Sequence, residues 1–434
     1  MKSLLLTINR ITLRMILSPV FVPLFLLLAA GLRIWWICTN DVWPVSDFEW
    51  YYQCATNLAH GVGYRYNGEV SAFFPPGYPV FLSLIIRLFG TSLFAIKCFS
   101  VLLQVSAVYL VYLLGRRLTS SEVAGRLAMM LLVFYPNHIA YSSILASENL
   151  FIPLLLLGTE LLLASEDRPW LLSLAGIIFG YAALTRPQVM LVPIIIFAVR
   201  NIAQRKQRPL QQWLLPIVAV HLLMAFVLSP WLWFTYKSFG HPVMTTSIGH
   251  NLWIANNANA NGTYVDVAEL EAQLTPGKND YERDKEKAQI AKNYRLTHPY
   301  QGISLLPARL KYLYMIDYDG TEWNILGYAN RLTTERHAWF IRYQEISQAY
   351  YLLLGLLFAC ALVIIPIRQF RQHHGPTLPV VGLCIVLYFT VVHLNILGMY
   401  RYHASMMPWV IISVGALLAL AFPNKQANDL HAQK

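Results

Sequence analysis

The chain has 434 residues, of which 13% are charged and 56% are hydrophobic. This charged share, about half the usual one, excludes an ordinary soluble protein, because so much exposed apolar surface would aggregate in water. The composition is typical of an all-α polytopic membrane protein, with room for roughly ten helices of about 20 residues each. The five cysteines form no C-x-x-C pair and indicate no disulfide framework.

The net charge of +11 is distributed unevenly, which argues against a nucleic-acid partner. Residues 237–346 hold 12 basic and 12 acidic side chains, which leaves 21 basic and 10 acidic side chains for the rest. We therefore predict an N-terminal membrane module (1–236), a mixed or helical extracytoplasmic insert (237–347) and a C-terminal membrane module with a short cytoplasmic tail (348–434).

Ten apolar runs predict transmembrane helices, at 15–37, 95–114, 123–140, 148–165, 170–185, 188–200, 211–235, 348–366, 377–397 and 406–422. An eleventh run, 78–89, follows a Pro-Pro-Gly break and is too short to span a bilayer. We interpret it as a re-entrant or interfacial helix in the first outer loop, 38–94. Within the insert, 280–296 predicts a charged surface helix and 302–316 a second one along the membrane.

Basic residues set the predicted orientation, because they are enriched in cytoplasmic loops. With a cytoplasmic N-terminus, ten spans place 15 of the 21 basic residues of the membrane body inside. Eleven spans would place Arg116, Arg117 and every later cluster except Arg168 outside. The first run lacks a small-residue cleavage pattern, so we interpret it as a span and not as a signal peptide.

Acids are few outside the insert, and five lie at the outer side of the predicted spans: Asp41, Asp47, Glu49, Glu69 and Glu148. A carboxylate at a membrane surface is costly unless it is paired or functional. These residues are therefore candidates for a site, and the alternative for each one is a solvated loop carboxylate.

Two arginines, Arg186 and Arg401, also lie at outer helix ends, against the general charge bias. A guanidinium suits a phosphate because its planar fork binds two oxygens and stays charged. The alternative is an arginine that snorkels to the interface. Acids and arginines at one membrane face favour a transferase with a lipid-linked sugar phosphate as donor.

Other patterns limit the function further. The sequence has no P-loop, no G-x-S-x-G motif and no histidines at metal-ligand spacing, so we expect no cofactor and have no support for a metal. The alternative function is a transporter or flippase for lipid-linked sugars, which predicts inverted repeats and acids near the bilayer centre; the sequence shows neither. A non-catalytic scaffold would explain the insert but not the acids and arginines.

A series of short motifs runs in order from about residue 15 to residue 422: Ser46-Asp47-Phe48-Glu49-Trp50-Tyr51-Tyr52, Phe74-Pro75-Pro76-Gly77-Tyr78-Pro79, Tyr135-Pro136, Ser147-Glu148-Asn149, Leu184-Thr185-Arg186-Pro187, Asn251-Leu252-Trp253, His298-Pro299 and Arg401-Tyr402 with Pro408. Together they resemble the motifs of bacterial C-type glycosyltransferases, relatives of protein O-mannosyltransferases and lipid A aminoarabinose transferases.

The resemblance implies inverting transfer of a sugar from a polyprenyl phosphate to a hydroxyl of a glycan, lipid or protein acceptor. The site would face the exterior of the bacterial cytoplasmic membrane. The residues implied are the base Asp47 with Asp41 as its competitor, the second acid Glu148, the donor-phosphate arginines Arg401 and Arg186, and the substrate contacts Trp50, Tyr51, Tyr52 and Tyr402.

One motif departs from the family pattern. Aminoarabinose transferases carry an acid and a lysine before the double proline, whereas this chain has Phe73 and Phe74. The departure disfavours an aminoarabinose donor. The first outer loop also has no Asp-x-Asp pair, so the metal requirement of oligosaccharyltransferases is not expected.

Overall fold

The computed structural model describes residues 11–203, 210–266, 271, 274–371 and 379–422. These residues are mostly helical, with one two-stranded hairpin, which confirms the predicted all-α fold class. Several basic residues that the sequence places in the cytoplasm lie outside the described ranges: Lys2, Arg10, Arg205, Lys206, Arg208, Lys425 and Lys434.

The N-terminal elements are α2 (Phe21–Thr39), α3 (Asp47–Ala59), β1 (Arg65–Tyr66), β2 (Glu69–Val70), α4 (Gly77–Phe89), α5 (Leu93–Thr119), α6 (Glu122–Val133), α7 (Pro136–Ala140), η1 (Tyr141–Ser143), α8 (Glu148–Ala164), α9 (Leu171–Thr185), η2 (Pro187–Leu191), α10 (Val192–Ala203) and α11 (Leu210–Phe239). The remaining elements are α12 (Ile248–Ala255), α14 (Asp280–Thr297), α15 (Pro299–Ser304), α16 (Leu306–Tyr314), α17 (Asp319–Tyr328), η3 (Ala329–Arg331), α18 (Thr334–Arg371), α19 (Pro379–Leu394), η4 (Tyr400–Ser405) and α20 (Met407–Ala419).

Each predicted span coincides with a helix or with consecutive helices, but their lengths differ. Four of the described helices, α2, α5, α11 and α18, are long and apolar enough to cross a membrane, and a fifth span results if a bent pair is counted as one. Several others have 10–17 residues. At 1.5 Å per residue, such helices are shorter than the roughly 30 Å hydrocarbon core. The chain is a multi-pass membrane protein, and the count of ten remains a prediction.

The bent pair is the predicted span 123–140, which breaks between α6 and α7 at an angle of 57°. Pro136 begins α7 and has no N–H to continue the helical bonding of α6. The fully buried Arg33 of α2 donates to the carbonyls of Leu132 and Val133 at 3.3 and 3.4 Å. These bonds satisfy carbonyl groups that the break leaves without helical partners.

The described part of the insert is helical. The predicted surface helix is α14, whose Asn279 and Glu282 form a capping box, and the second predicted helix is divided into α15 and α16. The boundary predicted at residue 347 falls inside α18, which runs without a break from Thr334 to Arg371.

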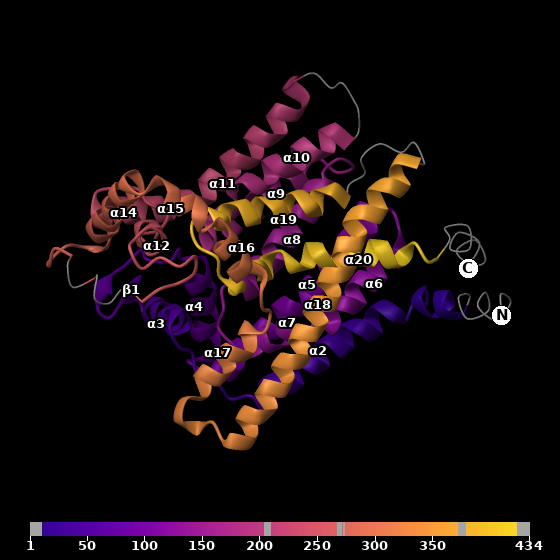
Figure 1. Ribbon diagram of the computed structural model, residues 1–434, viewed down its shortest axis with the longest axis horizontal. Coiled ribbons are helices and arrows are strands. Elements are labelled where there is room, and N and C mark those ends of the chain that lie inside the picture. The colour runs from indigo at the N-terminus through magenta and orange to yellow at the C-terminus, as the bar shows by residue number, and fades with distance from the viewer. Residues whose placement is uncertain (1–10, 204–209, 267–270, 272–273, 372–378, 423–434) are drawn as a thin grey trace.

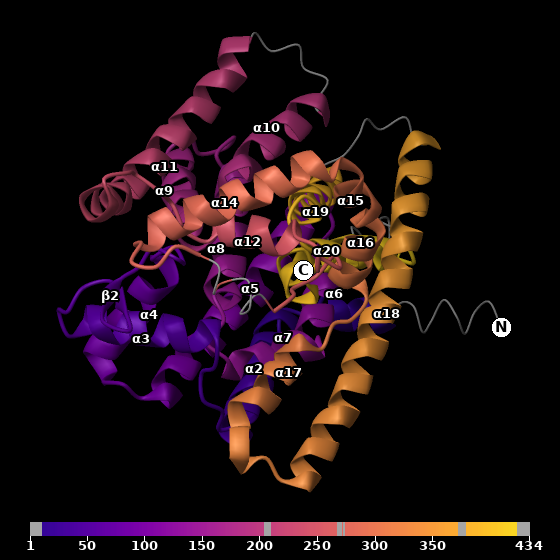
Figure 2. The same cartoon turned by 60° about the vertical axis from the view of Figure 1, so that its left-hand side comes forward.

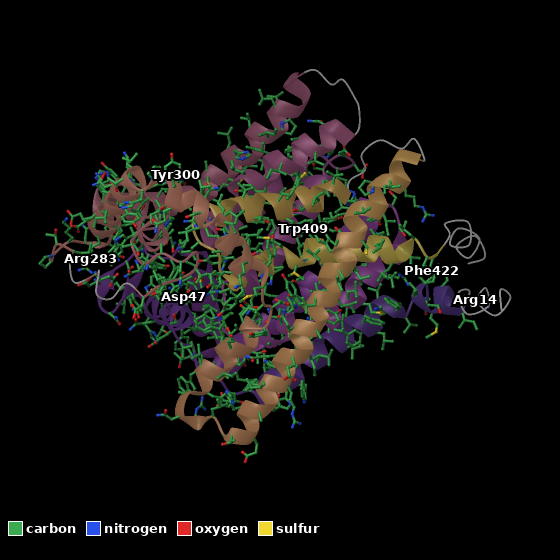
Figure 3. The ribbon with its side chains drawn as sticks, in the orientation of Figure 1. Arg14, Asp47, Arg283, Tyr300, Trp409 and Phe422 are labelled. Atoms are coloured by element: carbon green, nitrogen blue, oxygen red, sulfur yellow. The ribbon has the colours of Figure 1, made fainter. Side chains whose placement is uncertain are left out.

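Different parts of the chain gather at the two ends of the molecule (Figures 1 and 2). The insert helices α12, α14 and α15 lie at the same end as α3, α4 and the short hairpin. Figure 3 shows Asp47 and Arg283 at that end, whereas Arg14 and Phe422 lie at the opposite end. The predicted first outer loop and these insert helices therefore lie at one end of the molecule.

The predicted orientation gives a testable prediction. In a cysteine-free background, a cysteine at exposed Asp167, between α8 and α9, is expected on the cytoplasmic side, and one at exposed Lys292 of α14 on the outer side. An impermeant thiol reagent added to intact cells should label only the second variant. Labelling of both from outside would contradict the orientation.

Candidate active site

Asp47 is the first residue of α3 and directly follows a residue with an unusual backbone conformation. Ser46 before it has φ 54°, which a non-glycine residue adopts only at a cost. The Asp47 carboxylate accepts a hydrogen bond from Nη1 of Arg401 through Oδ2 at 2.8 Å. The side chain stays 36% exposed, so the carboxylate is both paired and open to solvent.

Arg401 joins two acids that are distant in the sequence. It lies on η4, and its side chain is only 6% exposed. Besides the bond to Asp47, Nε donates to Oε1 of Glu148 at 2.7 Å and Nη2 to Oε2 at 3.1 Å. The rings of Phe48 and Trp323 flank the guanidinium at 4.9 and 5.9 Å. Burial opposes the charge, but the two carboxylates hold the pKa of Arg401 above its ordinary value.

Glu148, at the start of α8, is fully buried and also contacts a second arginine, Arg186. Nη2 of Arg186 lies 2.5 Å from Oε1 of Glu148, and Nε of Arg186 donates to the hydroxyl of Ser147 at 3.2 Å. A buried carboxylate requires such pairing, because its desolvation is otherwise very costly. Four residues predicted from the sequence thus form one network of two acids and two arginines, with no net charge.

The competing base, Asp41, does not take part in this network. Its side chain is 77% exposed and pairs with Lys97 at 3.8 Å and with Arg331 at 3.2 Å. Glu49 and Glu69 are exposed as well. Of the five outer acids, the structure brings only Asp47 and Glu148 together.

The four predicted substrate contacts differ in exposure. Trp50 and Tyr51 are each 5% exposed and pack against Phe74, with ring centroids 5.1 and 5.0 Å away. The hydroxyl of Tyr52 donates to the carbonyl of Thr91. These contacts bury Trp50 and Tyr51 against Phe74 in the core of the first outer loop.

Tyr402 follows Arg401 on η4 and is half-buried. Its ring stacks on His393 with centroids 4.4 Å apart. Of the four predicted substrate contacts, Tyr402 is therefore the one next to Arg401 in the sequence.

A second polar cluster was not predicted. Asp317 lies just before α17 and Asp319 is its first residue, and both are fully buried. The amide of Asn137 donates to both carboxylates, at 2.6 and 2.8 Å, and the hydroxyls of Tyr135 and Tyr141 donate one bond to each. Sequence reasoning missed these acids because it treated the acids of the charge-rich insert as solvated.

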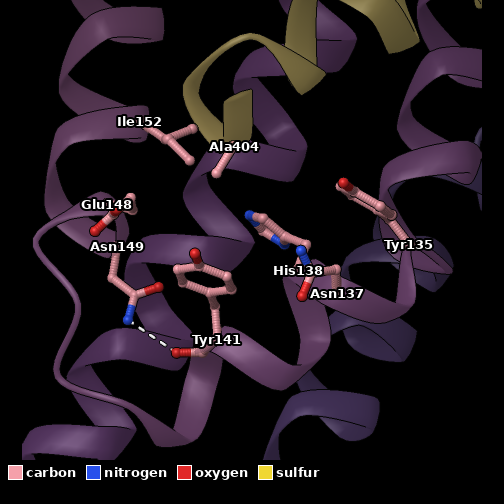
Figure 4. Close-up of a pocket in the computed structure, with 8 residues that line it drawn as sticks. All are labelled: Tyr135, Asn137, His138, Tyr141, Glu148, Asn149, Ile152 and Ala404. Atoms are coloured by element: carbon pink, nitrogen blue, oxygen red, sulfur yellow. Dashed lines mark hydrogen bonds between the residues drawn. The ribbon is translucent and has the colours of Figure 1, made fainter. Parts of the chain in front are cut away.

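A small cavity, with room for about one water molecule, lies between the network and this second cluster. Figure 4 shows Glu148 and Asn149 on one side of it and Tyr135, Asn137 and His138 on the other. Within the described ranges, no group of three or more His, Cys, Asp or Glu side chains is arranged to hold a metal ion.

Comparison with known proteins agrees with the resemblance stated from the sequence. The family model for dolichyl-phosphate-mannose-protein mannosyltransferase matches residues 74–234. No curated protein sequence matches the chain.

Solved structures give the fold. Archaeal oligosaccharyltransferase AglB from Archaeoglobus fulgidus, in complex with an inhibitory peptide and a dolichol-phosphate, is 14% identical with a TM-score of 0.57 over 93% of this chain and 50% of that chain. Its apo form gives 13% identity and a TM-score of 0.57, over 93% and 51%. ArnT from Cupriavidus metallidurans bound to undecaprenyl phosphate is 11% identical with a TM-score of 0.47, over 92% and 78%.

The chain spans about half the length of the oligosaccharyltransferase structures it matches. Within that span it has the C-type fold of membrane glycosyltransferases.

Proposed function

We propose that the protein is an inverting glycosyltransferase that moves a sugar from a polyprenyl-phosphate donor to a hydroxyl acceptor. The observation that carries the proposal is the network in which Arg401 joins Asp47 to the buried Glu148 while Asp47 stays partly exposed. An open carboxylate beside arginines suits a reaction that removes a proton and releases a phosphate at one place. The family model that matches residues 74–234 describes a transferase with a dolichyl-phosphate donor, which supports the donor class.

The proposed reaction is a single displacement. Asp47 takes the proton of the acceptor hydroxyl as its oxygen forms a bond to the anomeric carbon. The bond between that carbon and the phosphate oxygen breaks, and the polyprenyl phosphate leaves with the electron pair. Attack from the face opposite the leaving group inverts the anomeric configuration. Arg401 and Arg186 stabilise the negative charge that grows on the departing phosphate.

The two arginines differ in how they meet the donor. Arg401 donates to carboxylates from Nε, Nη1 and Nη2 and is 6% exposed, whereas Arg186 donates from Nε and Nη2 and is 12% exposed. We assign the first contact with the phosphate to Arg186. Arg401 turns part of its guanidinium from Asp47 to the phosphate when the donor is bound.

The proposed location is the bacterial cytoplasmic membrane, with the site on the outer face. The acceptor class is a surface glycan, lipopolysaccharide or a protein. Purified protein with labelled polyprenyl-phosphate sugars is expected to transfer the label, and mass spectrometry of the envelope with and without the gene identifies the acceptor. No transfer from any such donor, together with an unchanged envelope, would refute the proposed function.

Substitutions of Arg401 test its phosphate contact. Arg401→Ala is expected to weaken binding of labelled polyprenyl phosphate about 10- to 100-fold, the loss of one charge-assisted hydrogen bond. Arg401→Lys retains the charge but not the fork, so its loss is expected to be smaller. Arg117→Ala is the matched control. Arg117 pairs with Glu160 at 2.7 Å near the other end of α8. Unchanged affinity in Arg401→Ala would leave Arg401 as an ion-pair partner only.

A further inference from the structure

The short helix η4, which carries Arg401, is attached to the insert on both sides of that residue. Before it, the hydroxyl of Tyr400 donates to Oε2 of Glu322 at 2.7 Å. After it, His403 lies 2.7 Å from the carbonyl of Leu313 through Nδ1 and 3.0 Å from Oδ1 of Asp317 through Nε2. The insert therefore holds η4 through α17, α16 and the turn between them.

The contacts of His403 determine its protonation. A backbone carbonyl only accepts hydrogen bonds, so Nδ1 carries a proton to bond Leu313. Asp317 also acts as an acceptor, because the hydroxyl of Tyr135 and the amide of Asn137 already donate to its two oxygens. A neutral imidazole has one N–H, so bonding to both acceptors requires the imidazolium. His403 is 1% exposed and Asp317 is fully buried. Neither charge is stabilised by water, so each depends on its partner in the pair.

Two aromatic rings complete this environment. Tyr351 of α18 and Tyr314 of α16 lie nearly parallel to the imidazole, with centroids 5.2 and 6.1 Å away. The ring face of Tyr351 is near enough to attract a cation on the imidazole, and Tyr314 lies just beyond that range. Asp319 adds a second carboxylate nearby, held by Tyr141 and Asn137.

We propose that His403 is a positioning residue for Arg401, and that its charged contact with Asp317 holds η4 against the insert so that Arg401 meets Asp47 and Glu148. The proposal rests on the proposed glycosyltransfer for its effect on turnover, but not for its effect on stability. The six residues of η4 end one residue before α20, which orients the C-terminal side of η4. The ties to the insert add a second attachment that fixes where the guanidinium lies.

The proposal predicts a pH dependence with a definite sign. Burial opposes the charge of His403, but the bond to Asp317 and the charges of Asp317 and Asp319 raise its pKa above the ordinary 6.5. A raised folded-state pKa gives stability that is complete below pH 6.5 and is lost as the pH rises through the folded value.

Asp319 acts in a lower pH window. Burial raises its pKa from 3.8 to about 6, although the bonds from Tyr141 and Asn137 lower it. Its contribution is therefore lost between pH 3.8 and about 6. Of these two groups, only His403 contributes a loss of stability above pH 6.5, and the variants below separate it from other groups.

The first test is the unfolding temperature of the full-length protein in detergent between about pH 6 and about pH 9, a range that starts near the ordinary pKa of histidine and extends upward. The wild type is expected to lose stability across this range. In His403→Gln the dependence disappears because the titrating group is absent. In Asp317→Asn it disappears because no carboxylate holds the proton on His403. His298→Gln, an exposed histidine of the same insert, is expected to follow the wild type. An equal alkaline loss in all four proteins would overturn the proposal.

The second test separates positioning from general stability. His403→Gln is expected to lower turnover about 10- to 100-fold at pH 7, the range caused by a misplacement of about 1 Å. In an Arg401→Lys background the same substitution is expected to cost much less, because a residue that acts through Arg401 has little left to position. Equal losses in both backgrounds would refute the role. If His403→Gln does not fold, the pH profile of Asp317→Asn decides. If the wild type transfers no sugar, the proposed function fails, while the unfolding profiles still decide how η4 is held.

Discussion

Asp47→Asn is expected to fold and insert normally and to lose at least about a hundredfold in turnover, the lower limit for removing a general base. Asparagine keeps the shape of the side chain and can still accept the bond from Arg401, but it cannot take a proton. The start of α3 does not require the carboxylate, because the N-cap position is Ser46 and no side-chain cap bond is present there. The measurement is sugar transfer from a labelled polyprenyl-phosphate donor, with donor binding measured separately.

Asp41→Asn is the matched control for this substitution. Asp41 lies in the same outer loop, but it is 77% exposed and contacts Lys97 and Arg331 instead of the network. Its substitution is expected to cost much less. Near-normal turnover in Asp47→Asn would refute the assignment of the base, and a collapse in Asp41→Asn alone would move the base to Asp41.

The members of the acid–arginine network could be predicted because charges are scarce outside the insert. Asp47, Glu148, Arg186 and Arg401 stood out as charged side chains at outer helix ends. Their pairing could not be predicted, because Arg401 lies 354 residues from Asp47 and 253 from Glu148 in the sequence. Only the packing of α3, α8 and η4 shows that one guanidinium bridges both acids.

The buried acids of the insert could not be predicted from the scarcity of charges, because charges are common there. Asp317 and Asp319 are two of the 24 charged residues among the 110 residues 237–346, so composition alone does not single them out. A local signal was nevertheless present: Asp317 follows the apolar and aromatic run 312–316, so solvation was a poor explanation for it. Its partners on α7 and η4 again required the fold.

The hairpin of the first outer loop was also missed, although its turn has a clear sequence signal. Asn67 and Gly68 have φ 48° and 83°, the positive values that a two-residue turn between antiparallel strands requires. The strands have two residues each, too few for an alternating pattern. Only the Asn-Gly pair could have predicted them.

Glu148→Gln is expected to have the largest effect on stability. Glu148 is fully buried and pairs with both Arg401 and Arg186. An amide removes the negative charge and directs an N–H group toward a guanidinium that can only donate. Removing one partner of a buried pair costs about 3–5 kcal/mol. We expect the lower limit, because Asp47 still pairs with Arg401 and Arg186 is partly exposed.

Glu160→Gln is the control that separates loss of a charge pair from loss of this network. Glu160 lies on the same helix, α8, is 13% exposed and pairs with Arg117 at 2.7 Å. Both variants are expected to unfold at a lower temperature in detergent than the wild type, Glu148→Gln by more. Only Glu148→Gln is expected to lose sugar transfer at temperatures where it is still folded. In that variant Asp47 is the one carboxylate left to pair with Arg401. The tighter pair then competes with removal of a proton by Asp47. Full transfer by folded Glu148→Gln would show that Arg401 and Asp47 work without the buried acid.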